Sequence, residues 1–239
     1  MAKKKKPVTG RMRNLVVSVD RAILWVSRRW LLVFSVLVGT YVGLPFLAPV
    51  LMHLNFTGPA TIIYRLYSPF CHQFAYRSWF FFGDQPFYMA PQFQALTGID
   101  PYTTAGRLAA RAFYGNESMG YKVAYCERDV AIYFGILLAG LIYGIVRARG
   151  VRVRPLHWLL YGLIGIGPIA LDGFSQLLAQ PPFSLPFLPF RESTPFLRTL
   201  TGFLFGVMNV WLAYPYVEES MEDIKAELSA KFKRAGLAT

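Results

Sequence analysis

The chain has 239 residues, of which 54% are hydrophobic and only 16% are charged, yet its net charge is +12. Soluble domains carry roughly a quarter charged residues, so this composition argues against a soluble fold. A nucleic-acid partner fits the positive charge poorly, because the basic residues stand in short clusters beside apolar runs. The totals therefore indicate a membrane protein whose basic residues gather on one side of the bilayer.

Four stretches are long and apolar enough to cross a bilayer, which takes about 20 residues of helix. They are residues 31–52, 130–146, 156–178 and 196–217. Each must be helical, because backbone groups find no hydrogen-bond partners in lipid. The sequence therefore predicts an all-α polytopic membrane protein with one four-helix membrane domain over residues 31–217.

Basic clusters predict the orientation of these spans. They precede the first span (Lys3–Lys6, Arg11, Arg13, Arg28, Arg29), fill the loop between the second and third (Arg147, Arg149, Arg152, Arg154), and follow the fourth (Lys225, Lys231, Lys233, Arg234). Four spans place all three clusters on one side, which the positive-inside rule assigns to the cytoplasm. We therefore expect a multi-pass protein of the cytoplasmic membrane with both termini in the cytoplasm.

The two terminal segments are amphipathic. In the basic segment 1–30, Leu15, Val19, Ile23 and Val26 recur at helical spacing. The segment 218–239 begins with acidic residues and ends with basic ones, as the dipole of a helix favours. Both can lie on the inner membrane surface, and packing on a partner protein is an equal alternative for the C-terminal helix.

The long outer loop, residues 54–129, predicts further local structure. Thr61–Phe82 is aromatic but is interrupted by charged residues, which are costly within a span, so we expect a re-entrant or interfacial helix. Asp100 before Pro101 predicts the start of a short helix that Gly115 would end. The second outer loop, Gln180–Pro195, is rich in proline and phenylalanine and predicts an ordered, extended lid.

Ionisable and polar side chains near a membrane are costly and therefore informative. Most of those outside the basic clusters fall at the outer end of the predicted bundle, on four stretches that the topology should bring together. They are His53, Cys71, His72, Gln73, Cys126, Glu127, Arg128, Asp129, Asp172, Gln176, Arg191, Glu192, Ser193 and Arg198.

Several of these residues stand in motifs, namely Cys71-His72-Gln73 with Arg77-Ser78, Cys126-Glu127-Arg128-Asp129, Asp172-Gly173-x-x-Gln176 and Arg191-x-Ser193. These motifs resemble those of an uncharacterised family of small bacterial membrane proteins, a domain of unknown function, over roughly Tyr64 to Trp211. The family's second motif is Cys-x-x-Cys, whereas this chain has Asp129 at the last position. The resemblance implies a bacterial inner-membrane protein and the same helical fold, and it brings no established activity.

Three interpretations of the cysteines remain open. Cys71, His72, Cys126 and Asp129 are candidate ligands for zinc or another transition metal, with His53 in reserve. Alternatively, Cys71 and Cys126 form a disulfide, since both are expected on the oxidising side of the membrane. In the third interpretation they are unpaired thiols in an apolar setting.

The third and fourth spans carry opposite charges at their outer ends. We expect an ion pair between Asp172 and Arg198 that fixes the register of the two helices. In a catalytic alternative, Asp172 would be the base, and Arg198 or Arg128 would hold an anionic group. Two Gly-x-x-x-Gly patterns, Gly140 with Gly144 and Gly202 with Gly206, predict close helix contacts within the chain.

The sequence contains no phosphate-binding loop, dinucleotide fingerprint or nucleophile elbow. We therefore expect an accessory or scaffold subunit of a larger membrane complex, whose partners are the lipid bilayer and other membrane subunits and not a nucleic acid. The alternative is a membrane enzyme whose outer polar or metal site acts on a lipid or quinone-like substrate. A transporter fits least, because charged residues form no path across the bundle.

Overall fold

The structure is a computed structural model that describes residues 10–180, 183, 185–189 and 191–238. The predicted basic cluster Lys3–Lys6 and residues 181, 182, 184 and 190 of the expected lid lie outside the described residues. Within the described part, four helical stretches are long and apolar enough to cross a membrane: α1 (Gly10–His53), α5 (Glu127–Ala148), the helix Trp158–Leu178 and α8 (Pro195–Arg234). The predicted all-α polytopic membrane fold is thereby confirmed.

The third of these stretches changes its winding along its length. It consists of α6 (Trp158–Leu160), the π-helix η2 (Tyr161–Ile166) and α7 (Gly167–Leu178). The widened turn lies just before Pro168, which has no backbone N–H to donate. The hydroxyl of Tyr161 in this turn donates to Asn209 Oδ1 of α8 at 3.1 Å, which ties the π-helix to its neighbour.

Glycines allow α5 and α8 to approach closely. A Cβ atom added at Gly206 would lie 2.2 Å from the carbonyl oxygen of Ile132, and one at Gly202 would lie 2.6 Å from that of Arg128. On α5, a Cβ at Gly140 would contact the Tyr214 ring at 3.3 Å. The Gly-x-x-x-Gly patterns therefore make close contacts within the chain, as expected.

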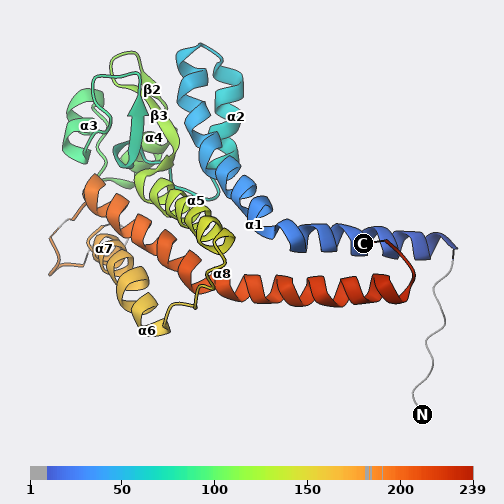
Figure 1. Cartoon of the computed structure of the whole chain (residues 1–239). Helices are drawn as coiled ribbons and strands as arrows, with labels where there is room; N and C mark the ends of the chain where they lie inside the picture. Colours follow the sequence, from blue (N-terminus) through green and yellow to red (C-terminus); the bar gives the residue numbers. More distant parts are fainter. Residues whose placement is uncertain (1–9, 181–182, 184, 190, 239) are drawn as a thin grey trace.

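The two terminal segments lie side by side as an antiparallel helix pair that extends away from the bundle (Figure 1). α1 bends at Arg29, whose φ of −127° and ψ of 20° are not helical, so its first half leaves the bundle beside the last half of α8. Lys231 Nζ lies 2.6 Å from Asp20 Oδ2, and Trp30 Nε1 donates to Glu218 Oε2 at 2.9 Å. The two amphipathic segments thus pack on one another, whereas the sequence predicted that they lie on the membrane surface or that the C-terminal one packs on a partner protein.

Between the first two spans lies a connecting subdomain, residues 54–126, which contains a small sheet that the sequence did not predict. Its elements are α2 (Thr57–Tyr67), η1 (Ala75–Arg77), β1 (Ser78–Phe81), α3 (Ala90–Thr97), α4 (Thr104–Ala112), β2 (Gly115–Asn116) and β3 (Gly120–Cys126). The strands are antiparallel in the order β1-β3-β2, with Phe80 opposite Lys122 and Asn116 opposite Gly120.

Three local predictions for this subdomain were wrong. The helix expected over Thr61–Phe82 ends at Tyr67, and the chain then turns into β1. The helix expected from Asp100 begins at Thr104, because the Thr103 hydroxyl accepts the N–H of Gly106, whereas Asp100 Oδ1 accepts the N–H of Tyr102 in the preceding turn. That helix ends at Ala112. Gly115 instead serves in β2, at a φ of +132° that L side chains rarely adopt.

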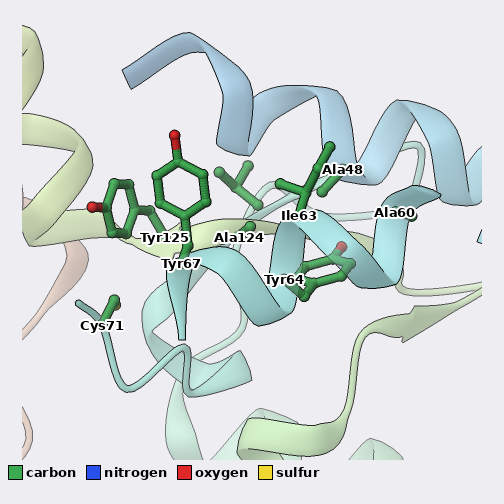
Figure 2. Packing of buried hydrophobic residues seen from close by; sticks show 9 residues of the cluster. Ala48, Ala60, Ile63, Tyr64, Tyr67, Cys71, Ala124 and Tyr125 are labelled. Carbon is green, nitrogen blue, oxygen red and sulfur yellow. The ribbon is translucent and has the colours of Figure 1, made fainter. Parts of the chain in front are cut away.

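A buried cluster packs α2, the end of α1 and strand β3 against one another (Figure 2). Its buried members are Ala48, Ala60, Ile63, Tyr64, Tyr67, Cys71, Val123, Ala124 and Tyr125. The Tyr67 hydroxyl donates to the Tyr41 carbonyl at 2.9 Å, and the Tyr64 hydroxyl donates to the Lys122 carbonyl at 2.5 Å. This packing fixes the turn after α2 and so places Cys71 beside the end of β3.

Candidate functional site

A cavity of about 620 Å³ lies where the connecting subdomain meets the ends of the spans. Its lining residues are Phe70, Cys71, His72, Phe74, Arg77, Arg107, Cys126, Arg128, Asp129, Gly173, Gln176, Leu177, Gln180 and Arg198. The first turn of α5 and the last turns of α7 both contribute to its wall. These turns are the ends of candidate membrane spans.

Two sulfur atoms and a carboxylate meet in the wall of this cavity. The Sγ atoms of Cys71 and Cys126 lie 2.8 Å apart, and Cys126 Sγ donates to Asp129 Oδ2 at 2.7 Å. One ligand atom from each of these three residues lies within 4.8 Å of the others. Cys126 is the N-cap of α5 and Asp129 is in its first turn, so three residues of helix bring the carboxylate back to the sulfur.

The structure assembles three of the four predicted metal ligands. His72 is exposed at the rim of the cavity and is not part of the compact group, and the reserve ligand His53 stacks on Phe82 with ring centroids 4.2 Å apart, outside the cavity. Two thiolates that share a tetrahedral zinc ion at about 2.3 Å each lie about 3.8 Å apart. The donor types suit zinc, but the observed 2.8 Å between the sulfurs is shorter than that geometry requires.

The two cysteines have different surroundings. Cys71 Sγ accepts the backbone N–H groups of Gln73 at 3.4 Å and of Cys126 at 3.3 Å. At Cys126, the hydrogen bond with the Cys71 sulfur, burial and the neighbouring Asp129 raise the pKa of the thiol well above its ordinary value. The raised pKa holds Cys126 in its protonated form, whereas the Cys71 sulfur is an acceptor for two backbone N–H groups.

Gln73 holds the turn that presents Cys71. Its φ of +53° lies in the left-handed region, and its buried amide Nε2 donates to the carbonyls of Tyr64 at 2.9 Å and Ala124 at 2.8 Å. These bonds tie the end of α2 to β3 across the turn. This position explains why a glutamine follows the Cys-His pair in the first motif.

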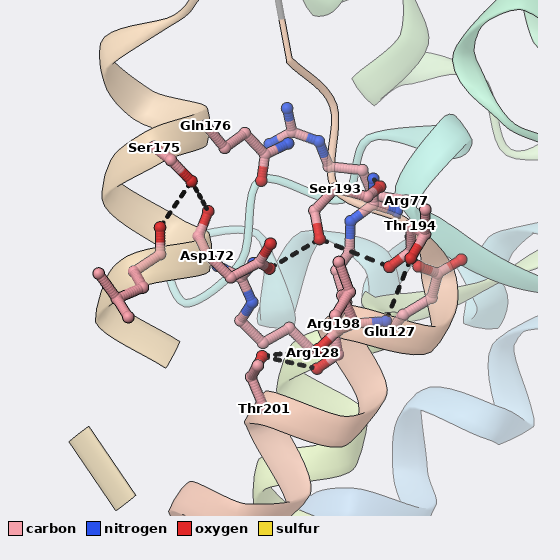
Figure 3. A network of polar contacts seen from close by, with 12 residues as sticks. Arg77, Glu127, Arg128, Asp172, Ser175, Gln176, Ser193, Thr194, Arg198 and Thr201 are labelled. Carbon is pink, nitrogen blue, oxygen red and sulfur yellow. Dashed lines mark hydrogen bonds and ion pairs between the residues drawn. The ribbon is translucent and has the colours of Figure 1, made fainter. Parts of the chain in front are cut away.

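Glu192 pairs with two arginines, Arg77 and Arg198. Figure 3 shows the arginine–carboxylate network to which these arginines belong, with Glu127 and Asp172. Arg77 binds Glu192 with two bonds, from Nε to Oε1 at 2.7 Å and from Nη2 to Oε2 at 2.8 Å. Arg198 Nη2 lies 2.6 Å from the same carboxylate, and its Nη1 lies 2.7 Å from Glu127 Oε2. Arg198 thus joins the N-terminal ends of α5 and α8 to the loop that follows α7.

The expected ion pair between Asp172 and Arg198 is wrong. Arg198 bonds to Glu127 and Glu192, because α8 packs its glycine face on α5 rather than on α7. Asp172 instead pairs with Arg128 at 2.5 Å and Arg191 at 2.8 Å. Its Oδ2 also accepts the Ser193 hydroxyl at 2.7 Å. Both carboxylate oxygens are therefore engaged by cations, which is unsuited to the general base of the catalytic alternative.

Four residues of the site were missed from sequence. No role in the site was assigned to Arg77, which stood only in the first motif and among the charges of the aromatic stretch, to Arg107, which was expected only within a short helix, or to Gln180, which was placed only in a loop. The Gln180 side chain accepts from Arg77 Nη2 at 2.8 Å and Arg107 Nη2 at 3.0 Å, and its spacing of four residues from Gln176 was an available signal.

Lys122 is the fourth missed residue. It is fully buried, and its Nζ donates to the carbonyls of Gln73 at 2.6 Å and Arg111 at 2.7 Å. Burial lowers its pKa to about 7. The sequence feature that could have identified Lys122 is its position as a lone lysine among apolar residues in the strand that ends at Cys126.

Positive charge exceeds negative charge around the cavity. Five guanidinium groups (Arg77, Arg107, Arg128, Arg191, Arg198) face four carboxylates (Glu127, Asp129, Asp172, Glu192) on its wall and in the network behind it. Phe70, Phe74 and Leu177 add apolar surface to the lining. This arrangement suits a ligand with an anionic group and an apolar body.

Residues 107–212 match a family described as "Predicted membrane protein (DUF2085)". The matched stretch contains the motifs at Cys126, Asp172 and Arg191 and begins after the one at Cys71. The chain is also 27% identical over 175 residues to "Uncharacterized protein MJ1492" of the archaeon Methanocaldococcus jannaschii, which covers 71% of this chain and 81% of the relative. No solved structure matches the chain. The comparisons thus show similarity to a family of predicted membrane proteins and to an uncharacterised protein. That relative is archaeal, whereas the sequence resemblance implied a bacterial family.

Proposed function

We propose that this membrane protein binds an anionic, amphipathic molecule of the membrane surface in the cavity between its connecting subdomain and its spans. The observation that carries the proposal is the excess of guanidinium groups over carboxylates around a cavity at the ends of the candidate spans. Arginine recognises carboxylate and phosphate oxygens in pairs, and the aromatic wall suits an apolar chain. These features support a lipid-like ligand for the polar site.

The proposal includes an orientation. The basic residues Arg147, Arg152 and Arg154 flank the ends of the spans opposite the cavity, and by the positive-inside rule that side is cytoplasmic. Both termini then lie in the cytoplasm of a cell whose inner membrane holds the protein, and the cavity opens on the outer side. Reporter fusions at Thr239 and after Asn116 test this: the first should be active only as a cytoplasmic reporter and the second only as an exported one.

The binding test uses the purified full-length protein and short-chain lipids. Dihexanoyl phosphatidylglycerol should raise the unfolding temperature more than dihexanoyl phosphatidylcholine at equal concentration, because only the first is a net anion. Arg107→Gln should abolish that difference, and the exposed Arg152→Gln at the other end of the bundle should leave it unchanged. An equal response to both lipids, or an equal effect of the two variants, would contradict the proposal.

A role as an accessory or scaffold subunit is the second candidate function. It is supported by apolar side chains on the first half of α1 that the terminal helix pair leaves exposed: Met12, Leu15, Val19, Ile23 and Val26. In a larger membrane complex this stripe would bury against another subunit. Complexes extracted in mild detergent should be larger for the wild type than for Val19→Glu/Ile23→Glu, and equal sizes would exclude this interface.

A further inference from the structure

The two cysteines in the cavity wall can form a disulfide, a reaction that the proposed ligand binding does not require. Cys71 and Cys126 both line the cavity, so a small molecule within it can reach their sulfur atoms. Their 2.8 Å separation is closer than ordinary van der Waals contact between sulfurs. Formation of a bond between them therefore requires only a small local movement.

The hydrogen bonds around the pair give each sulfur a separate role. Cys71 Sγ accepts two backbone N–H groups, from Gln73 and Cys126, which hold this sulfur in place against that of Cys126. Cys126 Sγ instead donates to Asp129 Oδ2 at 2.7 Å, so a proton acceptor is already in contact with the second thiol. These contacts suit Cys71 as the sulfur that attacks an incoming molecule and Cys126 as the sulfur that then bonds to Cys71.

We propose that Cys71 and Cys126 are a redox-active dithiol that is oxidised by low-molecular-weight disulfides bearing carboxylates. The Cys71 thiolate attacks one sulfur of the disulfide, which forms a mixed disulfide at Cys71 and releases the first thiolate. Asp129 takes the proton of Cys126, whose sulfur attacks that of Cys71 and expels the second thiolate. The proton passes from Asp129 to this leaving group. Cys71 gives its proton to water before it attacks, and the first released thiolate takes up a proton from water. The dithiol thus loses two electrons and two protons, and the small disulfide gains them and becomes two thiols.

The same cavity supplies the preference for an anionic partner. The guanidinium groups of Arg77, Arg107 and Arg128 line it together with the two sulfurs. Carboxylates of the small disulfide would bind these groups while its sulfurs face Cys71. Only this preference rests on the proposed function. The redox step does not depend on it.

A zinc ion held by Cys71, Cys126 and Asp129 is the rival interpretation, and the experiment separates the two. The reduced, purified protein is first analysed for metal and then mixed with oxidised glutathione or with uncharged 2-hydroxyethyl disulfide. Formation of the Cys71–Cys126 bond is measured over time by alkylating the thiols that remain free. We expect no stoichiometric zinc, disulfide formation with both reagents, and a rate about tenfold higher with the anionic reagent.

Single variants test the assigned roles. Cys126→Ser should accumulate a Cys71–glutathione mixed disulfide, visible by mass spectrometry, whereas Cys71→Ser should react at Cys126 at least about tenfold more slowly. Asp129→Asn should slow closure of the Cys71–Cys126 bond by about tenfold, with recovery at high pH, and should not change mixed-disulfide formation in the Cys126→Ser background.

Three results would overturn the inference: one equivalent of tightly bound zinc that protects both thiols, no reaction with either disulfide, or equal reactivity of the two cysteines. Equal reaction rates with oxidised glutathione and hydroxyethyl disulfide would support the redox role of the dithiol but refute its preference for anionic partners. That result would therefore count against the proposed anionic ligand. If Cys71→Ser fails to fold, the wild-type reaction with the two disulfides still decides the redox step.

Discussion

Arg198 and Glu127 form an ion pair in which Nη1 lies 2.7 Å from Oε2 and the side chains are only 4% and 1% exposed. The pair joins the N-terminal ends of α8 and α5, and Arg198 also reaches Glu192. Burial of charges is costly unless each is paired, so this contact determines how the two helices meet rather than adding net stability.

Arg198→Met should therefore destabilise the protein by about 3–5 kcal/mol, because it leaves Glu127 buried without its cation. Thermal unfolding of the purified protein measures the effect. The double variant Arg198→Met/Glu127→Met should recover part of the loss, since no unpaired charge remains. A double variant no more stable than the single one would show that Glu127 is not the partner that matters.

Lys122→Met should cost about 2–3 kcal/mol, although methionine fills a similar volume. The buried carbonyls of Gln73 and Arg111 would lose their donor, and unpaired buried acceptors are expensive. Denaturant unfolding measures the change, and the exposed Lys225→Met is the matched control, for which we expect almost no effect. Equal stability of both variants would refute this role for Lys122.

Lys122 should also make stability depend on pH. Its folded-state pKa of about 7 lies below its ordinary value of 10.5, so between these values the unfolded state binds more protons. The free energy of unfolding should therefore rise with pH across this window, by at most about 1.4 kcal/mol per unit. The difference between wild type and Lys122→Met at pH 6, 8 and 9.5 isolates this contribution from other groups. A difference that stays constant would mean that Lys122 keeps its ordinary pKa.

Gly206→Ala should weaken the contact between α5 and α8. The new Cβ would lie 2.2 Å from the Ile132 carbonyl, and the helices must separate to accommodate it, at a cost of about 1–3 kcal/mol. Gly43→Ala on α1 meets no atom within 4 Å and is the control. Near-ultraviolet circular dichroism during heating reports both, and a control that loses as much as Gly206→Ala would contradict this explanation.

Phe232→Ala should release the terminal helix pair without unfolding the bundle. Phe232 is 2% exposed near the end of α8, beside the Lys231–Asp20 ion pair. Its loss should cost about 3–5 kcal/mol of local docking free energy. We expect faster hydrogen exchange in residues 10–28 and 218–234 only, and the exposed Lys233→Ala should not change it. Faster exchange throughout α5 would mean that the pair is not a separate unit.

The spans, their number and the glycine contacts could be predicted from sequence, because each depends on a local pattern. Hydrophobicity over about 20 residues identifies a span, and lipid leaves the backbone no alternative to helix. The sheet of the connecting subdomain could not be predicted from sequence, because its strands are short and β1 pairs with β3 across the 38 residues between Phe81 and Gly120. The re-entrant or interfacial helix expected over Thr61–Phe82 ends at Tyr67, and aromatic residues beyond it pack this subdomain instead.

For the site, the sequence by itself determined which stretches carry polar residues at the ends of the spans, since such residues are costly there and stand out. Only the tertiary structure decided their partners: Asp172 with Arg128 and Arg191, Arg198 with Glu127 and Glu192, and Cys71 with Cys126. Polarity is a property of each residue and can be read one position at a time. The choice among several nearby opposite charges depends on helix rotation and on distances of a few ångströms, which are set by packing contacts between residues far apart in the chain.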